Sequence, residues 1–414
     1  MRAASVIVIA LAGCPAGTTP APAPHPPTTA PPPTTTEPGE PLTVEPPAVD
    51  AGAAPLLTGS PPVAARVWLT PTPVSWPKER TKAQFHGLGG GTPWSVAIAV
   101  SADGSTPVGI ARAVGGADEA VRWSGGTMSP LATLDLDGDD SSTAWAVSRD
   151  GKVVVGQSTA TNTSALPVRW GPDGKATRLP LPAGVDSAEA RAVSRDGKII
   201  AGCTGGGCDA VVRWSGASAP TPVATVTPFS LAAHPMSEDG KVLAGNQGGE
   251  REHAVRIDAS GSAAVFKGAR VEAISDDGTV MVGNIGTRAV LWRSKGAPVE
   301  LGVIDGYPEC YARAVSADGG RVIGNCIRRS GYVPVADEPR TPPPPDPQAS
   351  VAFVWDKRRG MRSVADALAD AGAKLPDGWW LDEAFDICAY GVTIVGDAHS
   401  PTSTNEAWMA IVPR

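Results

Sequence analysis

One fourteen-residue stretch, repeated along the chain, limits the fold more than any other feature of the sequence. Its clearest copy runs from Thr143 to Gly156 and reads TAWAVSRDGKVVVG. Small and β-branched residues lead to Ser148, Asp150-Gly151 interrupts the run, and valines then lead to Gly156. This order is typical of a strand, a tight turn and a second strand. We therefore interpret the stretch as a β-hairpin.

The spacing of the copies predicts a repeat architecture. Seven copies end at Gly109, Gly156, Gly202, Gly245, Gly283, Gly324 and Gly396. The first six turn serines are 38 to 47 residues apart, and Cys388 takes the seventh place. Each hairpin is followed by a weaker one whose first strand often ends in Trp, as in LPVRW at Trp170. Four short antiparallel strands of this spacing form a propeller blade, so we expect an all-β, seven-bladed β-propeller of four-stranded antiparallel blades.

The end of the chain supplies too few strands for a complete last blade. Three strands are expected at Ala384–Cys388, Val392–Asp397 and Glu406–Val412. A fourth strand at Lys82–Leu88 precedes the first complete hairpin. Because an unpaired edge would leave the ring open, we predict that this N-terminal strand pairs with Glu406–Val412 and closes the propeller.

The repeated turn explains why its residues recur. In a Ser-x-Asp-Gly turn the Ser and Asp oxygens accept hydrogen bonds from nearby backbone N–H groups, and Gly takes a left-handed conformation. We therefore interpret the repeated Asp as structural, the alternative being a ring of metal-binding carboxylates.

The pattern AVSxDGxxVVG, followed by a strand that ends in Trp, resembles the extracellular repeat family called HAF repeats. The resemblance covers about four-fifths of the chain. It implies an exported repeat protein and brings no established activity or catalytic residue. Ile257 replaces the Trp, Pro235 interrupts the fourth hairpin, and Cys388 and Tyr390 replace Ser and Asp, so we expect distortion in the fourth and seventh repeats.

The N-terminus, MRAASVIVIALAGC, resembles a bacterial lipobox. This resemblance implies that residues 1–13 are a lipoprotein signal peptide and that Cys14 carries the lipid. The apolar run is too short to span a bilayer as a helix. The alternative is a short hydrophobic start with a chance Cys. Residues 14–62 are rich in Pro, Thr and Ala, which predicts a disordered tether ahead of a repeat domain at 63–414. The expected location is the cell envelope, at the outer membrane or cell surface of a bacterium.

Two insertions are expected within the repeat domain. Residues 328–350 contain TPPPPDP and predict a long surface loop. Residues 363–371 predict a short helix that Ser363 caps and Gly372 ends.

Two segments could bind a ligand. The acidic run of Asp135, Asp137, Asp139 and Asp140 resembles a calcium loop, although it lacks the spacing of an EF-hand, and the alternative is a solvated acidic loop. Trp379 and Trp380 could form an aromatic platform for sugar rings, and the alternative is that they pack on the sheet. We therefore expect no cofactor, and calcium is the one alternative.

The cysteines suit an oxidising compartment once Cys14 is assigned to lipid. We expect one disulfide between Cys203 and Cys208 and another between Cys310 and Cys326, while Cys388 stays a buried thiol. The five histidines are scattered, and no Ser lies in a G-x-S-x-G setting. The sequence therefore shows no catalytic residues.

These patterns favour a lipid-anchored binding or scaffold module without catalysis. Its partners would be the membrane, through the lipid on Cys14, and an envelope protein or glycan. The net charge of −7 leaves no basic stripe for nucleic acid. Two alternatives stay open: a propeller lyase or hydrolase acting on extracellular polymers, and a purely structural envelope component.

Overall fold

The computed structural model describes residues 66–69 and most of 94–414. Its internal gaps are 113–117, 125–126, 135–140, 160–163, 207, 217, 224–228, 249–251, 294–296, 329–347 and 402–404. All described residues belong to one compact unit, Gly59–Arg414. Cys14, the tether, the expected strand at Lys82–Leu88, the acidic run at 135–140 and most of the Pro-rich loop lie outside the described residues.

Strands make up almost all of the described secondary structure. The first two repeats form β2 (Ser95–Val100), β3 (Pro107–Arg112), β4 (Asp118–Ser124), β5 (Thr127–Pro130), β6 (Ser141–Val147), β7 (Val154–Thr159), β8 (Leu166–Trp170) and β9 (Ala176–Arg178). The next two form β10 (Ala188–Val193), β11 (Ile199–Thr204), β12 (Ala210–Ser215), β13 (Thr221–Pro222), β14 (Phe229–Met236), β15 (Leu243–Gln247), β16 (His253–Ile257) and β17 (Ala263–Lys267). The last three form β18 (Arg270–Ile274), β19 (Val280–Ile285), β20 (Arg288–Arg293), β21 (Val299–Glu300), β22 (Glu309–Val315), β23 (Arg321–Ile327), β24 (Ser350–Asp356), β25 (Gly360–Ser363), β26 (Trp380–Ile387), β27 (Thr393–His399) and β28 (Glu406–Ile411).

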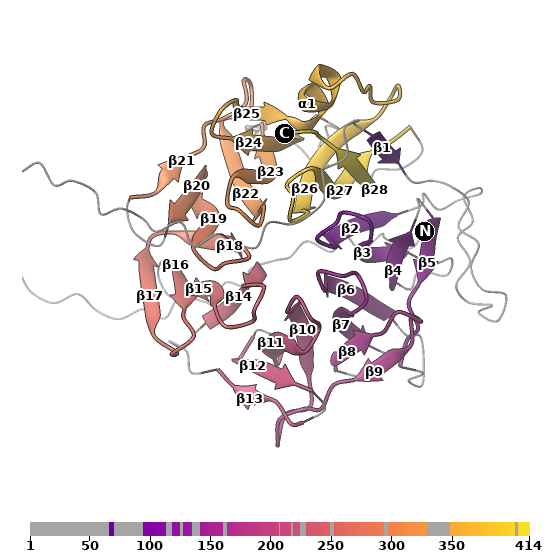
Figure 1. Ribbon diagram of the computed structural model, residues 1–414, viewed down its shortest axis with the longest axis vertical. Helices are drawn as coiled ribbons and strands as arrows, with labels where there is room; N and C mark the ends of the chain where they lie inside the picture. The colour runs from indigo at the N-terminus through magenta and orange to yellow at the C-terminus, as the bar shows by residue number, and fades with distance from the viewer. Residues whose placement is uncertain are drawn as a thin grey trace, which may run out of the picture. The chain divides into compact units, whose positions relative to one another are not determined.

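The strands of each repeat pair in chain order as an antiparallel meander. Within the described residues there are five four-stranded sheets and one eight-stranded sheet. The larger sheet consists of two four-stranded meanders joined by a parallel bridge between His234 and Ala273. Figure 1 shows the first strand of each repeat on the inside and the later strands further out. Each meander has the form of a β-propeller blade, so the expectation of an all-β chain of four-stranded antiparallel sheets is confirmed.

The Ser-x-Asp-Gly turns have the predicted geometry. In the second repeat Ser148 Oγ accepts a hydrogen bond from the Val153 N–H at 2.9 Å and donates one to Asp150 Oδ1 at 2.8 Å. Asp150 also accepts the Lys152 N–H at 3.1 Å, and Gly151 has a φ of +71°. The aspartate therefore holds the turn together in this repeat.

Every first strand also contains a β-bulge, which the sequence reading did not predict. In β6 the register shifts between Ala144 and Ala146, so that Trp145 is the extra residue. The bulge brings the backbone close to the glycine that ends the hairpin: a Cβ on Gly156 would lie 1.9 Å from the carbonyl oxygen of Thr143. This contact explains the closing glycine, because any side chain there would displace the neighbouring strand.

The two repeats with unusual sequences are the irregular ones, as predicted. In β14 the register is lost between Leu231 and Met236, around Pro235. In β26 there are two register shifts instead of one.

The hydrophobic core lies between successive sheets. Trp170 of the second repeat packs with Val108 of the first, and Trp214 of the third packs with Val155 of the second. Trp123 of the first repeat shares a core cluster with residues of the last, including Val395. The recurring tryptophans therefore pack between sheets, as expected from their period.

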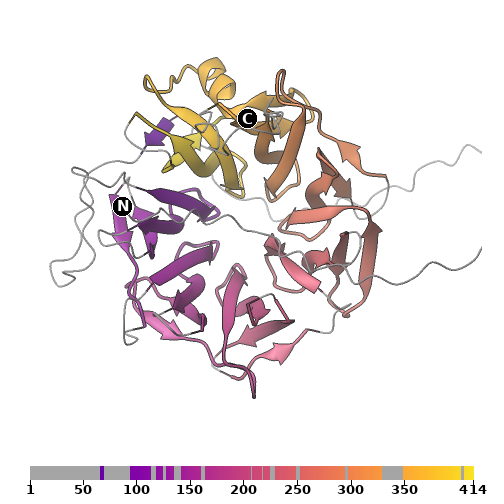
Figure 2. The same cartoon turned by 180° about the vertical axis from the view of Figure 1, so that it is seen from behind.

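The last sheet contains a strand from the beginning of the described chain. Here β1 (Arg66–Leu69) pairs antiparallel with β28, placing Arg66 opposite Ile411. Figure 2 shows this indigo strand beside the yellow strands of the chain's end. The prediction that Lys82–Leu88 pairs with Glu406–Val412 is therefore wrong, because β1 occupies the free edge of β28 and β27 the other edge.

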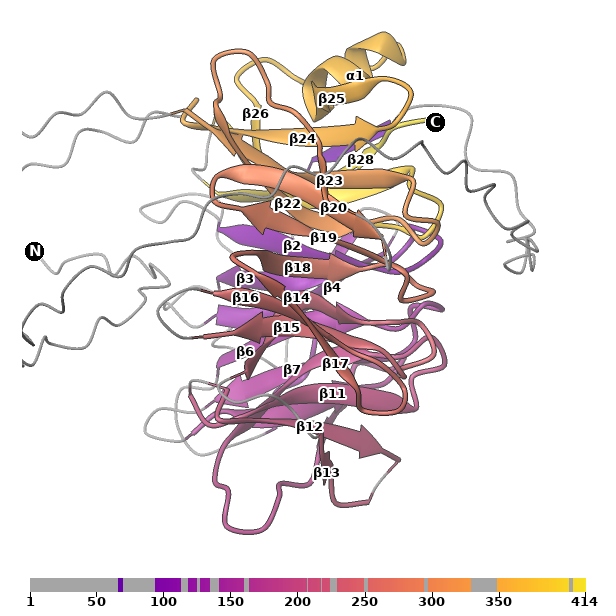
Figure 3. The ribbon, with the colours of Figure 1, turned by 90° about the vertical axis from the view of Figure 1, so that its left-hand side faces the viewer.

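The short helix and the cysteine pairs are placed as predicted. Helix α1 (Val364–Asp370) follows Ser363, whose Oγ accepts the Asp366 N–H, and it lies beside β24 and β25 (Figure 3). Cys203 and Cys208, and likewise Cys310 and Cys326, are at disulfide-bonding distance, whereas Cys388 is a buried free thiol. Among the described residues no helix is long and apolar enough to cross a membrane.

Candidate functional site

The turns of all the repeats converge on one central cavity of about 140 Å³. The residue between Ser and Asp of each turn lines it, and we call this set the mouth residues: Ala102, Arg149, Arg195, Glu238, Asp276, Ala317 and Ala389. Each turn directly follows the bulged first strand of its repeat and lies at this cavity, so residues far apart in the chain meet there. Every repeat therefore contributes residues to this cavity.

The backbones of neighbouring mouth residues are hydrogen-bonded to one another. The Ala317 N–H donates to Ala389 O, Ala389 to Ala102 O and Ala102 to Arg149 O, at 3.1 to 3.2 Å. On the other side Arg195 donates to Glu238 O and Glu238 to Asp276 O, both at 2.8 Å. One of these bonds joins the last repeat to the first. These five bonds connect successive repeats through the backbone and involve no side chain.

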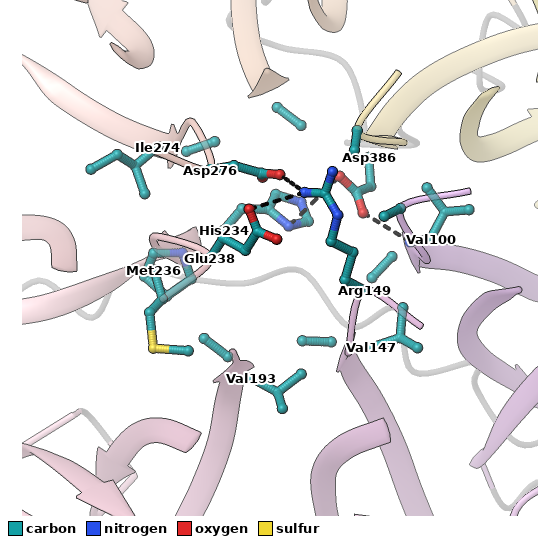
Figure 4. A pocket seen from close by; sticks show the side chains of 18 of the residues that line it. Val100, Val147, Arg149, Val193, His234, Met236, Glu238, Ile274, Asp276 and Asp386 are labelled. Carbon is teal, nitrogen blue, oxygen red and sulfur yellow. Dashed lines mark hydrogen bonds and ion pairs between the residues drawn. The ribbon is translucent and has the colours of Figure 1, made fainter. Parts of the chain in front are cut away.

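Four consecutive repeats carry charged mouth residues, Arg149, Arg195, Glu238 and Asp276. Figure 4 shows Arg149 pointing toward Glu238 and Asp276 in the cavity. Arg149 Nη1 contacts Asp276 Oδ2 of the fifth repeat and lies 3.3 Å from Glu238 Oε2 of the fourth. Arg195 Nη1 lies 2.6 Å from Glu238 Oε1. The side chain of Arg149 is only 12% exposed and is shielded from water, whereas that of Arg195, at the edge of the network, is 52% exposed.

A second polar connection crosses the same cavity. His234 of β14 lies with its Nε2 2.9 Å from Phe385 O and its Nδ1 3.9 Å from Asp386 Oδ1 of β26. Asp386 in turn accepts the backbone N–H groups of Val100 and Ile387, each at 2.8 Å. His234 therefore links the fourth repeat to the last through a carboxylate fixed by backbone donors.

Enclosure changes the acidity of the carboxylates in the cavity. Burial raises the pKa of Asp276 to about 6, because the pairing with Arg149 opposes the effect only in part and Glu238 adds repulsion. Burial also raises the pKa of Asp386, against the opposing influence of His234 and the Val100 N–H. Shifts of this kind accompany both ligand sites and structural ion pairs, so the geometry must decide between them.

A separate group of acidic residues lies in the last sheet, at the strand ends opposite the turns. Glu383 and Asp397 face each other in the register of β26 and β27, and Asp382 contacts His399 Nδ1. Burial and the nearby carboxylates raise the pKa of Asp382 and of Asp397 to about 8. Burial raises the pKa of Glu406 to about 7. Across the described part of the chain, no three His, Cys, Asp or Glu side chains come together as metal ligands.

Trp379 and Trp380, expected from the sequence as an aromatic platform, are not among the residues that line the central cavity. Trp379 and Trp380 pack, partly buried, against the largest core cluster, and Trp380 Nε1 donates to Ser350 O at 2.5 Å, which is the arrangement of a packing residue. The four aspartates of the expected calcium loop lie in the undescribed segment 135–140.

Sequence reasoning missed the residues of the cavity. A signal was present, since in the first six repeats the residue between Ser and Asp changes among Ala, Arg, Glu and Asp while Ser and Asp stay constant. His234 also lies beside Pro235, where the fourth repeat departs from the pattern.

Comparisons with known proteins give similar folds at low identity. No family model matches the chain, and no curated protein matches it. The chain is similar to a solved structure of a putative TolB from Agrobacterium tumefaciens, with 15% identity, 65% of this chain and 89% of that chain covered, and a TM-score of 0.39. It is similar to the Cps50 (Swd1) β-propeller domain from Myceliophteria thermophila, with 13% identity, 77% and 97% covered, and a TM-score of 0.46. It is also similar to an oligogalacturonate lyase in complex with manganese, with 12% identity, 78% and 91% covered, and a TM-score of 0.49.

Proposed function

We propose that this chain is a seven-bladed β-propeller, closed by β1 beside β28, that acts as an envelope binding and scaffold module with its ligand contact at the central cavity. Closure is supported by the core cluster and by the hydrogen bond from Ala389 to Ala102, which both join the last repeat to the first. The HAF-repeat resemblance supports export of the protein.

One observation carries the binding role: the mouth residues are charged in four consecutive repeats and are alanine in the other three. Alanine is evidently sufficient for the turn and for its backbone hydrogen bonds. The charged side chains are therefore not required by the fold, and they gather at a cavity open to solvent in part, where Arg195 is 52% exposed. Side chains that the fold does not need, placed together at a cavity, are typical of a binding site.

A second candidate function is an enzyme that acts on extracellular polymers. The observation that favours it is the carboxylate group of the last sheet, where Asp382 and Asp397 have a pKa of about 8 and Glu406 of about 7. Carboxyl groups that are partly protonated near neutral pH serve as general acids or bases.

The binding role is tested by making the whole mouth alanine. The variant Arg149→Ala, Arg195→Ala, Glu238→Ala and Asp276→Ala leaves no unpaired charge and copies the mouth residue of the first, sixth and seventh repeats. With Cys14→Ala in both proteins, so that no lipid anchor contributes, we expect the otherwise unmodified chain to be retained by its native envelope fraction and the alanine variant to lose at least tenfold of that affinity, with little change in melting temperature. A matched control is Lys198→Gln, which removes an exposed charge of the same face. Unchanged retention of the alanine variant would contradict the proposed site.

Lipid anchoring rests on the lipobox resemblance and is tested separately. Cys14→Ala removes the only side chain on which the thioether can form, so palmitate labelling should disappear and the protein should leave the membrane fraction. Each buried methylene of an acyl chain contributes about 0.8 kcal/mol, so the unmodified protein should survive a salt wash. Labelling that persists in Cys14→Ala would refute the anchor.

A further inference from the structure

The ion pairs of the cavity place two carboxylates against one shielded guanidinium. Arg149 Nη1 contacts Asp276 and also lies 3.3 Å from Glu238, while Glu238 has a second partner in Arg195 at 2.6 Å. Among the described ion pairs, Asp276 has one guanidinium partner and Glu238 has two, so Asp276 is the more easily released of the two carboxylates. Asp276 is therefore the carboxylate that an incoming anion would most readily replace.

The cavity has the shape and chemistry for such an anion. A guanidinium is a planar fork that pairs with a carboxylate through two parallel hydrogen bonds, whereas Arg149 contacts Asp276 and Glu238 through Nη1 in both cases. The volume of about 140 Å³ is roughly that of four or five water molecules, enough for a carboxylate with a few attached carbon atoms. Ala102, Ala317 and Ala389 keep the opposite side of the mouth free of large side chains.

We propose that the central cavity binds a carboxylate group, either of a small organic acid or of a uronate unit in a polysaccharide, with Arg149 as its anchor and Asp276 as a built-in competitor. This inference rests on the proposed binding role and names the chemistry of the ligand. In the unliganded protein Asp276 occupies the position that the ligand's carboxylate takes when it binds.

Acidification releases the competitor. The pKa of Asp276 is about 6, whereas sugar and simple aliphatic carboxylates keep a pKa near ~4 and stay ionised at pH 5. The other charged or titratable side chains that line the cavity are Arg191, Arg195, His234, Glu238 and Asp386. Asp386 faces His234 and not Arg149. Binding should therefore tighten as the pH falls through 6.

The experiment measures binding by calorimetry at pH 7.5 and pH 5.0, using the full chain. The probes are glucuronate for the small acid and alginate for the polymer, with glucose and dextran as neutral counterparts. Because the pKa of Asp276 is about 6, the side chain is mostly ionised at pH 7.5 and mostly protonated at pH 5.0, so binding that requires its release should be about tenfold or more weaker at pH 7.5. Binding of both acids would indicate recognition of the group alone, and binding of alginate only would identify the polymer.

Variants separate the anchor from the competitor. Asp276→Asn should bind tightly at both pH values and lose most of the pH dependence, whereas Arg149→Lys keeps the charge but not the fork and should lose at least tenfold of the affinity at both. Asp370→Asn, which removes an exposed carboxylate at the end of α1, should behave like the unmodified protein. Melting curves show that each variant is folded.

Three results would overturn the inference: Asp276→Asn with the pH dependence of the unmodified protein, Arg149→Lys with unchanged affinity, or no binding of either acid at either pH. In the last case the envelope retention experiment still decides the proposed function on its own, because the variant with four alanine substitutions removes all four charged mouth side chains and not the carboxylate site alone.

Discussion

Carboxylates at the two ends of the strands behave in opposite ways. At the turn end, partial burial acts to raise the pKa of Asp150, but hydrogen bonds from Ser148 and Lys152 outweigh it and lower the pKa. At the other end of the last sheet, burial and the neighbouring Glu383 raise the pKa of Asp397 to about 8. The residue type is the same, and the difference lies in whether N–H and O–H donors or other carboxylates surround it.

This difference separates the structural aspartates from those able to do chemistry. In the first six repeats the pKa of the turn aspartate is lowered, namely at Asp103, Asp150, Asp196, Asp239, Asp277 and Asp318. Each accepts a hydrogen bond from the serine of its own turn. Their period follows the repeat, which confirms that they serve the turns. The acidic residues of the last sheet have no counterpart of this kind.

The largest effect is expected from removing the serine hydroxyl of a turn. Ser148→Ala leaves the Val153 N–H without its acceptor in a fully buried site and should lower the free energy of unfolding by about 1–3 kcal/mol. Ser260→Ala removes an exposed hydroxyl that also bonds an aspartate, Asp258, and should cost less than about 0.5 kcal/mol. Urea unfolding at pH 7 measures both. Equal effects would mean that burial of the turn contributes nothing.

A stabilising effect is expected at the other end of the sheet. Because the pKa of Asp397 is higher in the folded than in the unfolded protein, its ionisation destabilises the fold as the pH rises from about 4 to about 8. Asp397→Asn should therefore raise the melting temperature by about 2–4 °C at pH 8.5 and have little effect at pH 4.5. The exposed Asp305→Asn serves as the control. A rise of the same size at both pH values would show that charge repulsion is not the cause.

The smallest effect is expected at a turn aspartate, with the opposite dependence on pH. The pKa of Asp150 is lowered in the folded protein, so its contribution is present above an unfolded value near 3.8 and is lost as the pH falls. Asp150→Asn should cost under about 1 kcal/mol at pH 7, since the side chain is half exposed, and almost nothing near pH 3. Calorimetric melts from pH 3 to pH 7 measure the slope. A slope of the same sign as that for Asp397 would remove the distinction between the two ends.

Local chemistry made the hairpins and turns predictable from the sequence. Ser148, Asp150 and Gly151 form a turn whose hydrogen bonds lie within five residues of one another, so the letters alone specify it. The β-bulge at Trp145 was not predictable, because an extra residue in an alternating strand is visible only when the partner strand is paired with it.

The cavity depends on contacts that no local pattern contains. Arg149 and Asp276 are 127 residues apart, and His234 and Phe385 are 151 residues apart. Their meeting follows from the order of the sheets around the cavity, and therefore from the whole repeat domain. A comparison of the repeats with each other would have singled out the mouth residues as the variable position in a constant turn.

The backbone hydrogen bonds between mouth residues have a consequence for how such a protein can change. Since Ala317, Ala389 and Ala102 join neighbouring repeats through N–H and C=O alone, a substitution there alters the cavity without altering the joint. The turn around it supplies the rigid frame. The three alanine positions carry no ion pair, so a single point mutation there is enough to present a new chemical group to the cavity, whereas the four charged positions are paired and change together. A library randomised at these seven codons would explore ligand recognition while leaving the architecture intact.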